Sequence, residues 1–258
     1  MVILPLTPFQ ATRIIGSTNV PDVTTYPWIV LITYLDSPNG QGSLINDRTV
    51  VTSGTVVYSM PITMHIRALL GVYDRSNVNE TINAEEIQTT YLHPGYVNTN
   101  QFADNIGLLI LKQPLTNSFS TICLPQRPAG YGIPSKATVI GWGASTPNGP
   151  LANILQQAEL QMYAPLACQM ANRLATNKNL CGGVVKPSPA LIATCTGDGG
   201  DPLVVMTTTT LELVGIGLDI VGYGCTTSHN YQPSMFTNVL SYIDWIITYG
   251  PGCECNIG

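Results

Sequence analysis

The clearest strand pattern in this chain is Trp28-Ile29-Val30-Leu31-Ile32-Thr33-Tyr34, which is followed by the turn-forming cluster Ser37-Pro38-Asn39-Gly40. Short runs of aliphatic, β-branched and aromatic residues that end in such clusters are typical of strands joined by tight turns. Comparable runs recur at Thr49–Thr52, Ile106–Leu111, Ala137–Gly141, Leu203–Thr207 and Leu211–Ile220. The 24 glycines and 19 prolines in 258 residues suit many tight turns. We therefore predict an all-β protein built as a barrel or sandwich.

Two segments have the pattern of helices. Pro165–Leu174 begins with a proline, which is favoured in the first turn of a helix. Asn238–Thr248 places apolar residues on one face and is followed by Gly250-Pro251, a pair that ends helices. We expect the second segment to form a C-terminal helix beside the strands.

The composition excludes several classes of protein. Charged residues make up 10% of the chain, against roughly 25% in ordinary soluble domains, and hydrophobic residues make up 45%, so the chain is not disordered. No run approaches the ~18–20 apolar residues that cross a membrane. The net charge of −5 argues against a nucleic-acid partner. With three histidines and no Cys-x-x-Cys pair, we predict no metal site and no cofactor.

The cysteines point to an oxidising compartment. Seven cysteines in a chain of this size favour disulfides, and Asn79-Glu80-Thr81 is an acceptor pattern for N-glycosylation. We therefore expect a secreted, extracellular protein. The start of the chain, Met1–Leu6, is too short and lacks the basic residues of an intact signal peptide.

The segment Arg13-Ile14-Ile15-Gly16, followed by Tyr26-Pro27-Trp28, resembles the activation site and first strand of trypsin-like serine proteases. Further landmarks of that family follow in order: Gly40–Ile45, Val50–Thr52, Asp104–Leu109, Cys123–Pro125, Gly141–Gly143, Cys195–Asp198, Pro202–Val204 and Ile243–Ile246. The resemblance implies two six-stranded antiparallel β-barrels with the cleft between them and a C-terminal helix. Residues 1–13 would then be an activation peptide or a remnant of cloning, and residues 14–258 the protease-homology domain.

The catalytic motifs depart from the family's pattern. The resemblance places Thr55 where the general base belongs and Gly199 where the nucleophile belongs, so that only Asp104 of the triad survives. Backbone N–H groups of Gly197 and Gly199 would remain as a relic of the oxyanion hole. Loss of the nucleophile costs on the order of 10⁶ in rate. We therefore predict an inactive homologue, and none of His65, His93 and His229 is expected to rebuild a triad.

Two aspartates near the altered triad carry structural expectations. We predict that the Thr55 hydroxyl and nearby backbone N–H groups stabilise Asp104, because a buried carboxylate needs donors. Asp201 replaces a glycine of the family in a tight segment, so we expect a new donor near it or a displaced loop.

The primary substrate pocket also differs from the family's pattern. By resemblance it would be formed by Ala193, Val221, Gly222 and Ser234. Val221 replaces a tryptophan that forms one wall, and Ser234 replaces a glycine that leaves the pocket open. The side chain of Ser234 is expected to narrow the pocket.

The resemblance also implies the covalent framework. It pairs Cys168 with Cys181 and Cys195 with Cys225, and leaves Cys123, Cys253 and Cys255, of which one is expected to join Cys123 to the tail. The family's cysteine pair around the histidine is replaced on both sides, by Gly40 and Val56. Arg13-Ile14 keeps the cleavage pattern, and Asp198 would receive the new amino group of Ile14.

These observations predict a secreted, proteolytically inactive homologue that acts by binding extracellular proteins. A narrower resemblance is to the inactivated protease paralogues of parasitic mites (scabies mite type), which are related to mite trypsin-like allergens. That resemblance implies interference with host defence, chiefly with complement. Two alternatives stay open: an altered hydrolase with a non-standard site, and a storage or structural secretory protein without a specific partner.

Overall fold

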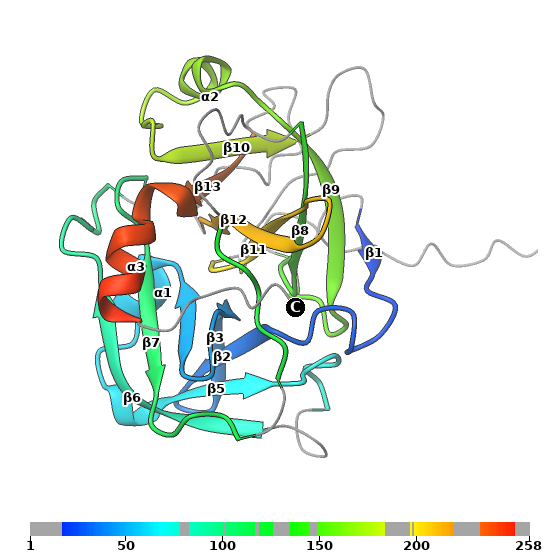
Figure 1. Cartoon of the computed structure of the whole chain (residues 1–258), viewed down its shortest axis with the longest axis vertical. Helices are drawn as coiled ribbons and strands as arrows, with labels where there is room; N and C mark the ends of the chain where they lie inside the picture. The colour runs from blue at the N-terminus through cyan, green and yellow to red at the C-terminus, as the bar shows by residue number, and fades with distance from the viewer. Residues whose placement is uncertain are drawn as a thin grey trace, which may run out of the picture.

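The computed structural model describes residues 17–77, 83–100, 102–116, 119–125, 135–144, 149–183, 197, 199–218 and 233–250. Their strands form two units that meet along a shared core (Figure 1). All the strand pairs between these elements are antiparallel.

The first unit is a closed six-stranded barrel in the lower half of Figure 1, with the strand order β2-β3-β4-β7-β6-β5. Closure leaves no exposed sheet edge, so every strand has a partner on both sides. Its strands are β2 (Ile29–Tyr34), β3 (Ser37–Leu44), β4 (Thr49–Thr52), β5 (Ile66–Leu70), β6 (Asn83–Leu92) and β7 (Gly107–Leu111).

The second unit lies above the first barrel in Figure 1 and has the order β9-β10-β13-β12-β11-β8, with β8 pairing back to β9. That last pairing closes a second ring of six strands, and β1 (Thr18–Asn19) adds to the outside of β9. Its strands are β8 (Lys136–Gly141), β9 (Gln156–Met162), β10 (Asn179–Gly183), β11 (Pro202–Met206), β12 (Leu211–Gly217) and β13 (Ser234–Asn238). The predicted fold of two six-stranded antiparallel barrels is confirmed.

The described residues contain three short α-helices and two 3₁₀ turns: α1 (Gly54–Tyr58), η1 (Thr63–His65), α2 (Pro165–Ala171), η2 (Val239–Tyr242) and α3 (Ile243–Tyr249). The two predicted helices are present, although α2 is shorter than expected and the C-terminal helix starts as a 3₁₀ turn. No helix among these is long and apolar enough to cross a membrane.

The C-terminal helix ties the second barrel to the first. Although α3 follows the last strand of the second barrel, it contacts the first barrel: the ring of Tyr249 lies 4.7 Å from that of Tyr91 on β6. Ile246 is fully buried in the core that the two barrels share. Burial of this apolar face stabilises the helix, since seven residues are too few for a helix to be stable alone.

The first hairpin differs from its prediction. Ser37–Gly40 was expected to form the turn, but these residues belong to β3, and the turn is Leu35-Asp36 between the paired residues Tyr34 and Ser37. Both turn residues have positive φ, 51° and 61°. Two-residue hairpins favour this geometry because it matches the twist of the strands, although Asn-Gly is the sequence that adopts it at least cost. The pairing of the strands therefore overrides the local turn preference.

Replacing Leu35-Asp36 by Asn-Gly is expected to raise the free energy of unfolding by roughly 1–2 kcal/mol, because it removes the strain of positive φ at two non-glycine residues. Urea denaturation with the disulfides intact measures the change. The control, Leu35→Ala/Asp36→Ala, removes the same side chains but leaves the strain, and we expect no gain from it. Equal stabilisation by both variants would contradict this account of the turn.

Candidate functional site

The structure tests only part of the predicted site. The following predicted residues lie outside the described residues: Arg13, Ile14, Asn79, Ala193, Cys195, Asp198, Val221, Gly222, Cys225, His229, Cys253 and Cys255. Thr55, Asp104, Gly197 and Gly199 themselves are among the described residues.

The structure contains the Cys168–Cys181 disulfide that the family resemblance implies. It joins α2 to β10, and the two Cα atoms are 5.8 Å apart. Cys123 is also disulfide-bonded, and its pairing falls outside the described residues.

Thr55 sits in the first turn of α1, a helix that the sequence did not predict. Its residues, Gly54-Thr55-Val56-Val57-Tyr58, include three that are β-branched and disfavour helices. The helix forms because the Ser53 hydroxyl accepts a hydrogen bond from the N–H of Val56 and caps the first turn. This places the Thr55 side chain, half-buried, toward the loop that precedes β7.

Asn105, and not Asp104, is the residue that faces Thr55. The Asn105 side-chain oxygen accepts from the N–H of Thr55 at 2.9 Å, and its amide nitrogen donates to the Thr55 hydroxyl at 2.9 Å. The Thr55 hydroxyl also lies 3.3 Å from the hydroxyl of Tyr96. Asn105 is fully buried, and its backbone carbonyl accepts from the Thr237 hydroxyl on β13 at 2.7 Å. The side-chain amide of Asn105 therefore holds α1, and its backbone carbonyl contacts the second barrel.

The prediction that Thr55 donates a hydrogen bond to Asp104 is wrong. Asp104 has a φ of 50°, and its carboxylate points to the other side of the chain, where it accepts from Lys178 Nζ at 2.7 Å and Tyr242 Oη at 3.1 Å. The left-handed backbone conformation at Asp104 directs its side chain away from Thr55, whereas the side chain of the next residue, Asn105, faces Thr55. The position of the surviving aspartate is therefore corrected: Asn105 occupies the place beside Thr55.

Asp104 forms an ion-pair cluster between the two barrels. Burial raises the pKa of Asp104, but the hydrogen bonds from Lys178 and Tyr242 and the charge of Lys178 outweigh it, so the pKa falls below its usual 3.8. Burial lowers the pKa of His93, against the opposing effect of the Asp104 charge. The Nδ1 atom of His93 accepts from the N–H of Gly95 at 3.1 Å, and its ring packs on Tyr242. This cluster is structural, since it points away from Thr55.

Gly199 lies next to α1 but carries no side chain. Its carbonyl accepts from the N–H of Gln41 at 3.1 Å. A Cβ atom added at Gly40 would lie 2.5 Å from Val56 Cγ2 and 3.3 Å from the Gly199 oxygen. Val56 thus fills the space beside Gly40, and the two residues that replace the family's cysteine pair are in contact. The absence of a side chain at Gly40 lets α1 and the turn at Gly199 approach each other.

The segment after Gly199 is tightly fixed. Gly200 has a φ of 87°, and a side chain there would collide with the Gln41 carbonyl and the Thr52 hydroxyl. Asp201 is fully buried, and its carboxylate lies against Gly141, where there is no room for a side chain. The glycine at 141 therefore provides the space that the Asp201 side chain needs, a compensation that sequence reasoning missed.

Ser234 is the one residue of the predicted primary pocket that the structure describes. It is buried in β13, opposite Gly182 of β10. The other residues assigned to this pocket lie outside the described residues, so the predicted narrowing of the pocket stays a prediction.

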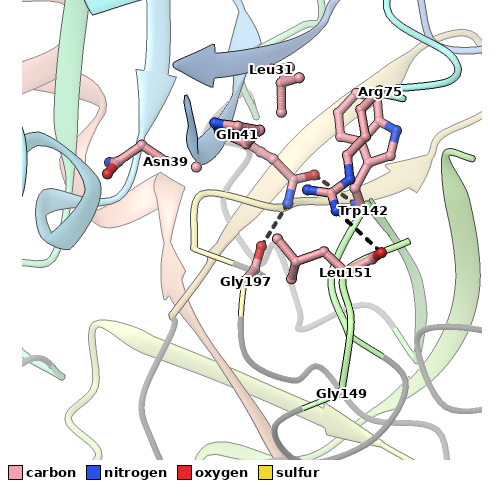
Figure 2. Close-up of a pocket in the computed structure, with 10 residues that line it drawn as sticks. Leu31, Asn39, Gln41, Arg75, Trp142, Gly149, Leu151 and Gly197 are labelled. Carbon is pink, nitrogen blue, oxygen red and sulfur yellow. Dashed lines mark hydrogen bonds between the residues drawn. The ribbon is translucent and has the colours of Figure 1, made fainter. Parts of the chain in front are cut away.

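A cavity of about 480 Å³ lies beside Gly197 and Gln41 (Figure 2). The side chain of Gln41 lines this cavity. Its amide nitrogen donates to the Gly197 carbonyl at 3.0 Å, and its amide oxygen accepts from the N–H of Trp142 at 3.0 Å. Leu151 lies directly over Gly197, so that a side chain at position 197 would collide with it. This cavity could not be predicted from the sequence, because strands and loops from both barrels line it.

Two closed six-stranded antiparallel barrels that share a core are the architecture of a trypsin-like serine protease homologue. In agreement, residues 14–246 match the family described as Trypsin, and the chain belongs to that family.

Two relatives share most of the chain. Phenoloxidase-activating enzyme 1 of Spodoptera litura is 29% identical over 255 residues, which cover 91% of this chain and 66% of the relative. Coagulation factor XI of Bos taurus is 27% identical over 250 residues, which cover 93% of this chain and 38% of the relative. The chain therefore spans less than two thirds of the length of these relatives.

Asp104→Asn is expected to lower the free energy of unfolding by about 1 kcal/mol at pH 7, a value discounted for the exposure of Lys178. Because the pKa of Asp104 is lower in the folded than in the unfolded chain, its stabilising effect is complete above about pH 4 and is lost as the pH falls. Urea denaturation at pH 7 and pH 3 should show a difference between wild type and variant that shrinks at pH 3.

The matched control is Asp47→Asn, which changes the same charge at an exposed position. We expect it to leave the stability at pH 7 within about 0.5 kcal/mol of wild type. A loss in Asp104→Asn that is equal at both pH values would show that the carboxylate acts through packing rather than charge.

Proposed function

We propose that this protein is a secreted member of the trypsin family that does not hydrolyse peptide bonds and acts by binding another extracellular protein. The observation that carries the proposal is the mutual hydrogen bonding of Thr55 and Asn105 beside a glycine at position 199. Neither an amide nor a threonine hydroxyl takes up a proton near neutral pH, and Gly199 offers no atom that could attack a carbonyl carbon. The arrangement supplies neither the base nor the nucleophile of the reaction.

The described histidines support the same interpretation. His65 belongs to η1 and packs edge-on against Tyr34 at the end of the first hairpin, with the ring centres 6.2 Å apart. His93 is held by Gly95 and lies among Tyr242, Trp245 and the Asp104 carboxylate. Both side chains have packing roles away from Thr55, which argues against a rebuilt triad that uses either of them.

The proposal also states that the protein is secreted and that its partner is an extracellular protein. The Cys168–Cys181 disulfide favours an oxidising compartment. The resemblance to inactivated protease paralogues of parasitic mites makes complement the first host system to examine. Adding the purified protein to normal serum is expected to lower complement-dependent lysis of sensitised erythrocytes in a dose-dependent way. Reduced and alkylated protein is the control, and undiminished lysis at micromolar protein would contradict the complement part of the proposal.

Wild-type protein is expected to show no labelling by a fluorophosphonate probe and no cleavage of peptide or ester substrates, because position 199 has no side chain to react. Labelling is measured by intact mass, with trypsin as the positive control. Stoichiometric labelling of the wild type would refute the absence of a nucleophile and would favour an altered hydrolase.

Restoration variants separate the missing groups. Thr55→His/Gly199→Ser should remain a poor hydrolase, since an asparagine would still face the histidine. Adding Asn105→Asp is expected to raise the rate of ester hydrolysis by roughly 10⁴, the effect of a carboxylate over an amide at this place in a triad. Adding Asp104→Asn instead should give no gain. If the double variant turns over esters as fast as the triple variant, the assignment of Asn105 is wrong.

A further inference from the structure

The helix α2 carries its large apolar side chains on the outside. Of its seven residues only Cys168 is buried. Leu166 and Met170 are 68% and 78% exposed, and Leu174, just beyond the helix, is 54% exposed. A helix at a protein surface normally turns such side chains toward the core, as α3 does with Ile246. These three exposed side chains, which we call the α2 patch, therefore add little to the core of this chain.

The α2 patch is a continuous surface at one end of the molecule. Leu166 and Met170 are four residues apart in a helix, so their side chains lie on one face. Leu174 follows in a turn that Asn172 fixes, since its side-chain oxygen accepts from the N–H of Leu174 at 2.9 Å. In Figure 1, α2 lies above β10 at the upper end of the molecule, away from α1, which carries Thr55. Grouped apolar side chains on a surface are typical of a protein–protein contact.

A disulfide and a hydrogen bond hold α2 in this orientation. Cys168 is bonded to Cys181 of β10, and both pack in a buried cluster with Phe102 and Met235. The N–H of Asn172 donates to the Cys168 carbonyl at 2.9 Å and closes the last turn. A helix of seven residues is not stable alone, so these contacts keep its apolar side chains directed outward. A surface that is already ordered loses less entropy when a partner binds.

Arg173 provides a positive charge beside the α2 patch. It is exposed, and it has no hydrogen bond or ion pair among the described residues. Lys178, the other cation of this segment, is paired with Asp104 at 2.7 Å. Residues 163–183 contain no aspartate or glutamate. This surface is therefore locally positive, although the chain as a whole has a net charge of −5, and it is complementary to an acidic partner.

We propose that the α2 patch docks an acidic polypeptide segment of a partner protein, with apolar side chains on Leu166 and Met170 and a carboxylate on Arg173. The proposal rests on the proposed binding function and names where that binding occurs. An anionic membrane is disfavoured, because its extended surface would repel a chain of net charge −5, whereas a single segment meets only the local charge. A second copy is disfavoured because three side chains offer much less than the ~800 Å² that each partner buries in a standard interface.

The test is a selection of random dodecapeptides on immobilised wild-type protein, followed by affinity measurements on variants. We expect the selected peptides to combine apolar residues with Asp or Glu. Leu166→Gln/Met170→Gln should weaken their binding about tenfold or more, because glutamine keeps the helix propensity but removes the apolar contact. Arg173→Gln should abolish the preference for acidic over amide residues in the peptide and keep the preference for apolar ones.

Met206→Gln is the matched control, because it removes an apolar side chain that is 69% exposed at the end of β11, elsewhere on the same barrel. It should bind the selected peptides as the wild type does. Absence of binders, or binding that is equal on wild type and Leu166→Gln/Met170→Gln, would overturn the proposal.

Two further measurements examine the other occupants. A dimer in sedimentation velocity that Leu166→Gln/Met170→Gln dissociates would assign the α2 patch to a second copy, and co-sedimentation with phosphatidylserine–phosphatidylcholine vesicles would assign it to a membrane. Either result would overturn the proposal. Mass spectra of the peptides are recorded after incubation: intact peptides that ignore the α2 substitutions refute this surface alone, whereas cleaved peptides refute the inactive function.

Discussion

The buried amide of Asn105 is the contact on which the region around Thr55 and Gly199 depends. Its side chain holds α1 through both the backbone and the hydroxyl of Thr55, while its carbonyl accepts from Thr237 of the second barrel. A fully buried polar side chain must satisfy its hydrogen bonds internally, because water cannot reach it. The two bonds to Thr55 do so, and the bond from the Thr237 hydroxyl to the Asn105 backbone carbonyl joins this region to the second barrel.

At the positions that differ from the family's pattern, neighbouring residues fill the space and satisfy the polar groups. Thr55 supplies a hydroxyl that pairs with a neutral amide, so no charge has to be buried there. Val56 fills the space beside Gly40, and Gly141 makes room for the Asp201 side chain. The carboxylate of Asp104 is taken up by Lys178 and Tyr242 on the other side of the chain. The interior around Thr55 and Gly199 is therefore both packed and hydrogen-bonded.

The local residue pattern predicted some strands correctly and missed others, as well as one helix, for physical reasons. Thr49–Thr52 was predicted with the bounds that β4 has, because its residues are apolar or β-branched and all buried. In contrast, β6 (Asn83–Leu92) was missed, since it is mostly polar and only Ile87 is buried; pairing with β5 and β7 makes it a strand. The helix α1 was missed because its β-branched residues disfavour a helix, and a cap from Ser53 and a bond from Asn105 stabilise it.

The sequence by itself determined the all-β class, the order of the family's landmarks, and the absence of a side chain at Gly199, since a glycine is visible in the sequence. Only the tertiary structure decided which of the neighbours Asp104 and Asn105 faces Thr55, and that Arg75, Gln41 and Gly197 line one cavity. Side-chain direction at Asp104 depends on a left-handed backbone conformation, and the cavity depends on segments more than a hundred residues apart. Neither is encoded in local pattern, because both follow from how the closed barrels pack together.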